Sequence, residues 1–329
     1  MSDAPHWDSP VLRSVRPVVE RSRHVSVSEE AVESVASWLA YEELPFPRNL
    51  SIAPYDHDED PDRAIDLIML VSSLNFAFTD FDTGQKFVVE RDGVSLVDTD
   101  GMSARIHDAL AEDVPLLDGS YLAQVSRDDL DRMFRGSITM PLLDERARIL
   151  NDVGRVLVER YQGRFHQFVA DCAPAMYSEG DGLLERLVAE FPRFDDVSEY
   201  HGHRVLFYKL AQFALWSLHG AGLVAIADLD RMSAFADYIL PVALRVMGIL
   251  KYAPQLEQAV TDGELIERDS DQEIEIRANT LHATALLTDA VNARRPEHLR
   301  VVIPQIDFRL WKHYHPTFRP HHLIVTTMY

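Results

Sequence analysis

The sequence predicts a mainly α-helical protein with one small antiparallel β-hairpin inserted among its helices. Apolar residues recur every three or four positions along much of the chain, which is the period of a helix with one buried face. Only residues 86–97 place two short valine-rich runs on either side of a tight-turn sequence, Arg91-Asp92-Gly93. The chain has 329 residues, of which 47% are hydrophobic, so it can bury a sizeable core.

The N-terminal part predicts an arm followed by two helices. Residues 1–25 carry scattered Pro, Ser and Arg, so we expect an arm that lies over the surface. Ser28 caps a segment whose apolar side chains share one helix face, namely Val32, Val35, Ala36 and Leu39. Asp60-Pro61 supplies the cap and first residue of the next helix, and residues 65–74 are apolar nearly all round, which predicts a central helix.

Helical patterns dominate the chain after the hairpin. Ser126 and Asp129 have the spacing of a helix cap, and a longer helix is expected to follow Pro141. Further helical segments are expected at residues 183–191, 204–219, 229–250 and 273–292, and a short strand at 323–325. The sequence shows no internal repeat. We therefore expect one domain over residues 1–329, with the arm at 1–25 and the hairpin insert at about 84–100.

The charge balance restricts the partners of the protein. The chain has 32 Lys and Arg against 53 Asp and Glu, a formal net charge of −21. Proteins that bind long stretches of DNA or tRNA do so mainly through Lys and Arg that neutralise phosphates. A direct grip on nucleic acid is therefore not expected, whereas a small-molecule ligand is.

Cysteine content and hydropathy indicate the compartment. The single cysteine, Cys172, excludes an intrachain disulfide and zinc sites of the CxxC type. The N-terminus shows no basic stretch followed by an apolar run, and no window reaches ~18 uninterrupted apolar residues. We expect a cytoplasmic protein without a membrane span.

The sequence offers two weak candidates for a metal site. Asp56, Asp58 and Asp60 have the spacing of a calcium loop, but Pro61 and Leu67 stand where that loop needs Gly and Glu. Four histidines crowd the C-terminus without a cysteine or an HExxH helix, namely His313, His315, His321 and His322. We expect a solvated acidic loop in the first case, and no metal or other cofactor.

Two segments carry acids in unusual surroundings. Asp237 stands among aromatic and aliphatic residues, where burial would raise the pKa of its carboxyl group and suit it to act as a base or electrostatic stabiliser. The simpler alternative is a helix cap, or an ion pair with Arg231 or Arg245. Asp307 lies beside Phe308 and Trp311, a pattern that suits a flat cationic ligand, although core aromatics beside a surface acid would look the same.

A third segment is basic. His203 and Arg204 near an expected helix start are suited to receive a phosphate, with a surface loop as the alternative. Signatures of a hydrolase nucleophile elbow, a P-loop or a dinucleotide-binding fold are absent from the sequence.

Five segments in this order resemble the queuosine salvage proteins, which are queuosine 5′-phosphate N-glycosidases. They are LNFAF at residues 74–78, FYKLAQ at 207–212, FADY at 235–238, EIEIR at 273–277 and IDFRLW at 306–311. The resemblance extends over essentially the whole chain. It implies a largely helical fold similar to helix-hairpin-helix DNA glycosylases, and hydrolysis of the bond that joins queuine to ribose 5′-phosphate, which frees queuine for tRNA modification.

The resemblance also assigns residues. It places the essential aspartate at Asp237, a substrate-binding acid at Asp307 and part of the base pocket at Phe235. Cleavage of an N-glycosidic bond builds positive charge on the sugar, which a carboxylate in a dry pocket stabilises. The same carboxylate can accept a proton from the attacking water. Because queuine is a 7-deazaguanine, help to the leaving base is limited and more of the barrier must be lowered at the sugar.

The remaining expected contacts follow the chemistry of queuosine 5′-monophosphate. Asp307 suits the protonated amine of queuine, and Lys209, His203 and Arg204 suit the phosphate. Phe76, Phe78 and Trp311 suit stacking on the base. The full set of expected substrate-binding residues is Phe235, Asp307, Phe308, Trp311, Asn75, Phe76, Tyr208, Lys209, His203 and Tyr238.

Two other functions stay open on the sequence. One is a non-catalytic queuosine- or nucleoside-binding protein. The other is a nucleic-acid base-excision glycosylase, against which the net charge of −21 argues.

Overall fold

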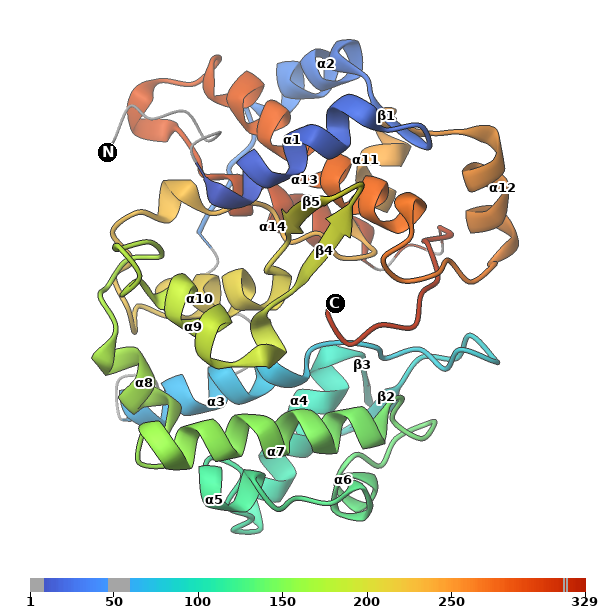
Figure 1. The fold of residues 1–329 in the computed structure, drawn as a ribbon. Coiled ribbons are helices and arrows are strands. Elements are labelled where there is room, and N and C mark those ends of the chain that lie inside the picture. The colour runs from blue at the N-terminus through green and yellow to red at the C-terminus, as the bar shows by residue number, and fades with distance from the viewer. Residues whose placement is uncertain (1–8, 47–59, 316, 318) are drawn as a thin grey trace. The chain divides into compact units, whose positions relative to one another are not determined.

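The computed structural model describes residues 9–46, 60–315, 317 and 319–329, and these are mainly helical, as predicted (Figure 1). They fall into two compact units that interleave along the sequence. Unit 1 comprises the described parts of Met1–Pro47, Asp196–Gln212 and Asp228–Val325. Unit 2 comprises the described parts of Arg48–Asp195, Phe213–Ala227 and Thr326–Tyr329.

Unit 1 is built around the long helix α13 (Asp271–Asn292). Helices α1 (Pro10–Arg21), α2 (Glu29–Leu39), α11 (Leu240–Val246) and α14 (Ile303–Tyr314) all pack on it. Sixteen of its side chains are buried, because neighbours cover it on nearly every side. The unit also contains α12 (Pro254–Asp262), the first turn of α10 (Lys209–Gly220), and the 3-10 turns η3 (Leu229–Arg231) and η4 (Glu297–Leu299).

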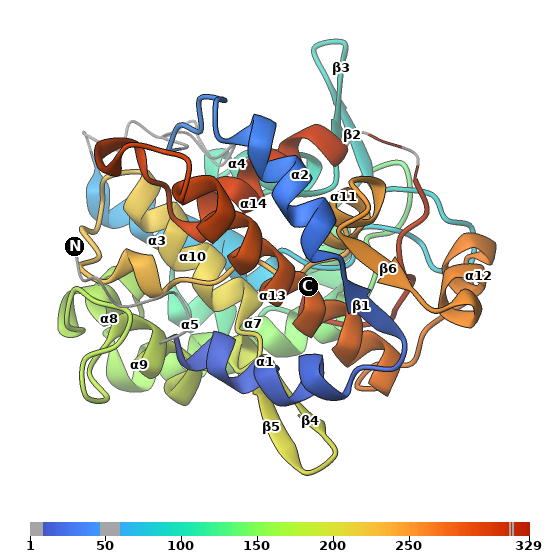
Figure 2. The same cartoon turned by 90° about the horizontal axis from the view of Figure 1, so that it is seen from above.

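Two antiparallel strand pairs complete unit 1. β1 (Val25–Val27) pairs with β6 (Leu250–Tyr252), and β4 (Val197–Tyr200) pairs with β5 (His203–Leu206). The β4–β5 hairpin turns at His201 and Gly202, both with positive φ, and extends beyond α1 in Figure 2. Neither pair was predicted from the sequence.

Unit 2 is built around α3 (Pro61–Leu74), whose residues from Ala64 to Leu74 are all buried. Asp60 caps this helix by accepting the Arg63 N–H at 3.0 Å, as predicted. The other elements are β2 (Val88–Arg91), β3 (Val94–Val97), α4 (Thr99–Ala111), α5 (Gly119–Leu122), α6 (Arg127–Met133), α7 (Leu143–Arg160), α8 (Phe165–Asp171), α9 (Leu183–Glu190), η2 (Pro192–Phe194) and the rest of α10.

Several predicted elements of unit 2 are confirmed. β2 and β3 form the expected hairpin, in which Val88 faces Val97 and Arg91 faces Val94 across the turn. Ser126 and Asp129 make both hydrogen bonds of a capping box at the start of α6. No helix in the described part of the chain has the length and apolarity that a bilayer crossing needs.

Four expectations about secondary structure are wrong. Residues 10–21 form α1 rather than a surface arm, and the helix buries Val11, Leu12, Val15 and Val18. The segment expected to be helical from residue 204 is strand β5 up to Leu206, and the helix starts at Lys209. The segment 229–250 is helical only in η3 and α11. Residues 323–325 make one isolated bridge, Leu265 to Leu323, instead of a strand.

Candidate active site

The segment that carries Asp237 lies in unit 1, in the irregular stretch between η3 and α11. Asp237 is 8% exposed. Its Oδ1 accepts the N–H groups of Ile239 at 2.8 Å and Leu240 at 2.9 Å, where α11 begins. Its Oδ2 accepts no hydrogen bond from the described residues. One carboxylate oxygen therefore fixes the side chain, and the other has no such donor among the described residues.

Of the two simpler interpretations of Asp237, the structure shows the hydrogen bonds of a helix cap and no ion pair with Arg231 or Arg245 among the described residues. Oδ1 accepts the Ile239 and Leu240 N–H groups at the start of α11. The ion pairs are different ones, because Arg231 pairs with Asp228 at 3.4 Å and Arg245 pairs with Glu257. The helix-start contacts thus involve only one of the two oxygens of this carboxylate.

Asp307 is a second buried acid beside the first. It projects from α14, is 3% exposed, and accepts the Phe235 N–H through Oδ2 at 2.6 Å. Burial raises the pKa of Asp307 well above its usual value, and the charge of Asp237 raises it further. The Phe235 hydrogen bond and the charge of Lys209 act in the opposite direction. The alternative of a surface acid is therefore wrong.

Lys209 places a cation within electrostatic reach of Asp307. It is the first residue of α10 and is buried, and its backbone N–H donates to Asp196 Oδ2 at 3.3 Å. Its charge acts on Asp307. Asp237 and Lys209 both act electrostatically on Asp307, and we call these three residues the acid cluster.

The aromatic residues near the acid cluster have partners of their own. Phe235 is buried in the segment that leads to Asp237, and Phe308 is half-buried on α14. The Tyr238 ring lies 4.7 Å from that of His321, and the Trp311 ring stacks on His315 at 4.4 Å between centroids.

Tyr208 directly precedes Lys209 and has a φ of 49°, a left-handed backbone that is rare for an aromatic residue. Such a conformation persists only where the surroundings hold it in place.

His203 lies on strand β5, opposite Tyr200, and not at a helix start as expected. Its Nε2 is 3.0 Å from Arg21 Nη1. Arg204 is exposed on the same strand. The basic segment thus belongs to a hairpin, and the backbone N–H groups of a helix terminus do not support it.

The expected contacts from residues 74–78 lie in unit 2. Asn75 accepts the Thr99 hydroxyl at 2.7 Å. Phe76 is 1% exposed, and the guanidinium groups of Arg146 and Arg193 lie 4.2 and 4.7 Å from its ring centroid. These contacts make Phe76 part of the core of unit 2.

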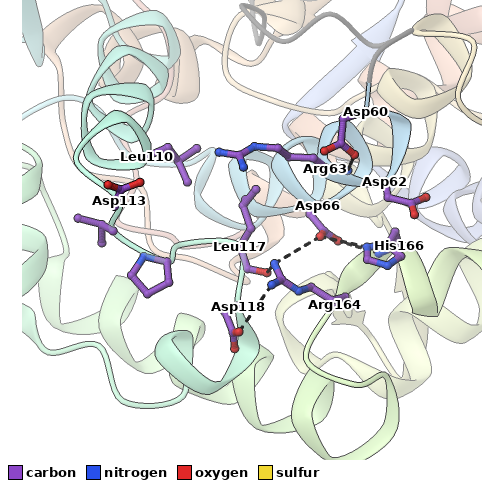
Figure 3. A pocket seen from close by; sticks show the side chains of 12 residues that line it. Asp60, Asp62, Arg63, Asp66, Leu110, Asp113, Leu117, Asp118, Arg164 and His166 are labelled. Carbon is purple, nitrogen blue, oxygen red and sulfur yellow. Dashed lines mark hydrogen bonds and ion pairs between the residues drawn. The ribbon is translucent and has the colours of Figure 1, made fainter.

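Unit 2 also contains a hollow of about 450 Å³, which Figure 3 shows. Asp66 accepts the His166 N–H at 2.8 Å and lies 3.1 Å from its Nδ1, which ties α8 to α3. Burial raises the pKa of Asp66, and the His166 contacts partly offset this. Arg164 donates to the Leu117 carbonyl at 2.8 Å. Asp66, His166 and Arg164 thus have structural partners, and none of the predicted site residues lines this hollow.

The metal candidates can be placed only in part. Asp56 and Asp58 lie outside the described residues. Within those that are described, no three His, Cys, Asp or Glu side chains gather as metal ligands would. His322 is buried in unit 1, and His313 is exposed on α14.

Comparison with known proteins identifies the family. A family model described as queuosine salvage protein matches residues 55–329. The chain belongs to the queuosine salvage protein family. Three relatives are each named queuosine 5′-phosphate N-glycosylase/hydrolase. The one from Sphaerobacter thermophilus is 36% identical, and the match covers 92% of this chain and 91% of the relative.

The other two relatives come from eukaryotes. The Mus musculus protein is 31% identical, with 91% of this chain and 90% of the relative covered. The Schizosaccharomyces pombe protein is 28% identical, with 92% and 90% covered.

In this member of the queuosine salvage family, four of the five resembling segments meet in unit 1. FADY contributes Asp237, IDFRLW contributes Asp307 and FYKLAQ contributes Lys209 to the acid cluster. EIEIR lies on α13, and its Arg277 donates a hydrogen bond to the Ala236 carbonyl of the FADY segment. Sequence reasoning gave Arg277 no role and missed Asp196, because neither stands in a spacing that signals chemistry.

Proposed function

We propose that this protein hydrolyses the N-glycosidic bond of queuosine 5′-monophosphate and releases queuine, with Asp237 as the catalytic carboxylate. The observation that carries the proposal is the acid cluster, in which a buried carboxylate has one oxygen fixed, while the other accepts no hydrogen bond from the described residues. The names of the relatives, queuosine 5′-phosphate N-glycosylase/hydrolase, agree with this chemistry.

Asp237 acts on the sugar in this proposal. As the base departs, positive charge develops on the ribose ring, and a fixed carboxylate that is screened little by water stabilises that charge. Oδ2, which accepts no hydrogen bond in the described part of the chain, is the atom that faces the ribose or accepts a proton from the attacking water. The oxygen held by Ile239 and Leu240 keeps the side chain in one orientation during the reaction.

Asp307 suits the protonated amine of queuine. Its raised pKa shows that nearby protein groups do not fully compensate a negative charge at this position. A cationic ligand supplies the missing compensation and favours the ionised carboxylate. The substrate amine and Asp307 therefore stabilise each other when they meet.

The other substrate contacts stay as predicted from the sequence. Lys209 and His203 are proposed for the phosphate. The base and ribose are proposed to contact Phe235, Tyr208, Tyr238, Phe308 and Trp311. Asn75 and Phe76 belong to unit 2, and their contacts with the substrate stay predictions from the sequence alone. A single queuosine-salvage-type domain, a fold like that of helix-hairpin-helix glycosylases, a cytoplasmic location and the lack of a direct grip on tRNA or DNA are proposals of the same kind.

The test measures free base released from queuosine 5′-monophosphate by chromatography, with queuosine and guanosine 5′-monophosphate in parallel reactions. Asp237→Asn keeps an oxygen for the Ile239 and Leu240 N–H groups, so it should fold and yet lose about 10²–10³ in rate. Asp262→Asn, at an exposed position of α12, is the matched control and should retain the wild-type rate.

Three results contradict the proposal. Wild-type release by Asp237→Asn removes that residue from catalysis. Tight binding of the nucleotide without release of base indicates a binding protein. Faster excision of bases from duplex DNA indicates a base-excision glycosylase.

A further inference from the structure

Arg277 is a buried cation that the proposed chemistry does not use. It projects from α13 and is 2% exposed. Its Nη1 and Nη2 donate to Asp196 at 3.0 and 2.6 Å, and its Nε donates to the Ala236 carbonyl at 3.1 Å. Its guanidinium lies 3.9 Å from the Phe207 ring centroid. The planar group thus spans three chain segments at once, which only its fork of donors allows.

The Ala236 carbonyl belongs to the peptide unit that leads directly into Asp237. The Nε hydrogen bond therefore fixes the orientation of that peptide plane next to the Asp237 Cα. One residue earlier, the Phe235 N–H is held by Asp307, and Ser233 donates its N–H to Gln212 Oε1 at 2.9 Å. This stretch is neither helix nor strand. The Asp237 N–H donates to the Phe235 carbonyl at 2.7 Å, and side chains from other elements hold the neighbouring backbone groups.

Asp196 extends the same contact to Lys209. Its Oδ2, which accepts from Arg277, also accepts the Lys209 N–H at 3.3 Å. Its backbone carbonyl accepts the N–H groups of Phe207 at 3.0 Å and Tyr208 at 3.1 Å. These bonds hold Tyr208 in its left-handed conformation, and that conformation directs the chain into α10 at Lys209.

We propose that Arg277 is a positioning residue for Asp237 and that Asp196 transmits its position to Lys209. Its role as an aid to turnover rests on the proposed function, whereas its control of the 235–240 backbone does not. A buried ion pair is weak evidence for stability, because desolvation offsets its attraction. Here the Arg277–Asp196 pair binds the Ala236 carbonyl, next to Asp237, and the Lys209 N–H. We therefore assign the pair a role in positioning these two residues of the acid cluster.

Glu275 provides a matched control on the same helix. It is as buried as Arg277, and it accepts the N–H groups of Arg23, His24 and Val25 through Oε2. Its Oε1 accepts the Tyr200 hydroxyl at 2.9 Å. Glu275→Gln weakens a buried network two residues from Arg277 without touching the peptide before Asp237.

The first experiment compares kcat and KM of Arg277→Lys and Glu275→Gln for queuosine 5′-monophosphate, at a temperature where both are folded. Lysine keeps the charge beside Asp196 but cannot bridge Asp196 and Ala236 together. We expect kcat of Arg277→Lys to fall about 10- to 100-fold with KM changed less than threefold, because misplacement of a catalytic group acts mainly on turnover. Glu275→Gln should keep kcat within about twofold.

The second experiment follows amide hydrogen exchange of residues 235–240 in the same variants. Arg277→Lys should speed exchange there at least about tenfold, and Glu275→Gln should not. Asp196→Asn, in which the acceptor charge is removed, should repeat the effect of Arg277→Lys on both readouts. A kcat within twofold of wild type together with unchanged exchange overturns the positioning role.

The two readouts also separate the inference from the proposed function. If the wild-type protein releases no base, the proposed function fails, while faster exchange at residues 235–240 still supports control of this backbone by Arg277. If the wild type turns over and neither variant differs from it, the inference fails alone.

Discussion

His322 is expected to make the protein sensitive to acid. Its imidazole is 1% exposed in unit 1. Burial lowers the pKa of His322 to about 3, and positive charge on three neighbours acts in the same direction, namely His321, Arg277 and Arg245. Folded protein therefore keeps this histidine neutral under conditions in which a free histidine is charged.

The size of the effect follows from the two pKa values. In the unfolded chain His322 takes up a proton near pH 6.5, so below this pH the unfolded state binds more protons than the folded state. The free energy of unfolding then falls as the pH falls from about 6.5 towards about 3. The loss is about 2 kcal/mol between pH 7 and pH 5, and about 5 kcal/mol once the folded pKa is passed.

Urea unfolding at pH 7, 6 and 5 measures this loss in the wild type and in His322→Gln, which cannot be charged. Other groups also titrate in this range, so the relevant quantity is the difference between the two proteins. We expect that difference to change by about 2 kcal/mol in favour of the variant between pH 7 and pH 5. His313→Gln, at an exposed position of α14, should follow the wild type. Parallel pH dependence of wild type and His322→Gln would refute the reasoning.

Two further outcomes are expected in unit 2. Gly154→Ala should lower the free energy of unfolding by about 3 kcal/mol in urea titrations, because its Cβ would lie 2.3 Å from the Ala123 nitrogen and 2.6 Å from the Gly119 carbonyl oxygen, both backbone atoms. A loss under 1 kcal/mol would contradict this. Burial raises the pKa of the Cys172 thiol to about 12, so alkylation by iodoacetamide at pH 8 should be at least about tenfold slower in folded protein than in urea; equal rates would contradict it.

Local patterns predicted the elements whose structure is determined locally. The all-round apolar stretch of α3, the Asp60 cap and the Arg91-Asp92-Gly93 turn each act over a few residues, and each is found as predicted. The apolar positions of α1 also have helical spacing. The expectation of an arm rests on the scattered Pro, Ser and Arg of this segment, although Pro10 stands at the first helical position, where proline is tolerated.

Long-range hydrogen bonds explain the failures near the site. Residues 232–238 have an apolar content that suits a helix, but Gln212, Asp307 and Arg277 bind their backbone groups from other parts of unit 1. Pro241 then stands in the first turn of α11, which begins at Leu240, instead of lying inside a longer helix. A local pattern carries no information about these partners.

The candidate site could be predicted in composition but not in arrangement. Asp237 and Asp307 were singled out by their apolar surroundings and by the family resemblance, and the structure brings them within electrostatic reach. The ion pair of Asp196 could not be predicted from the sequence, because its partner, Arg277, lies 81 positions away. Its own neighbours in the chain give no sign of a buried ion pair.

The buried carboxylates of unit 1 differ in how far neighbouring protein groups compensate their charge. Glu275 is compensated by three backbone N–H groups and Asp196 by the Arg277 fork, so neither needs a further partner. Asp307 has one backbone donor and a raised pKa, beside a second carboxylate. Buried negative charge without full compensation costs stability in the free protein, and a cation removes that cost. Under the proposed function, this cation is the amine of the bound base or the charge that develops on the ribose.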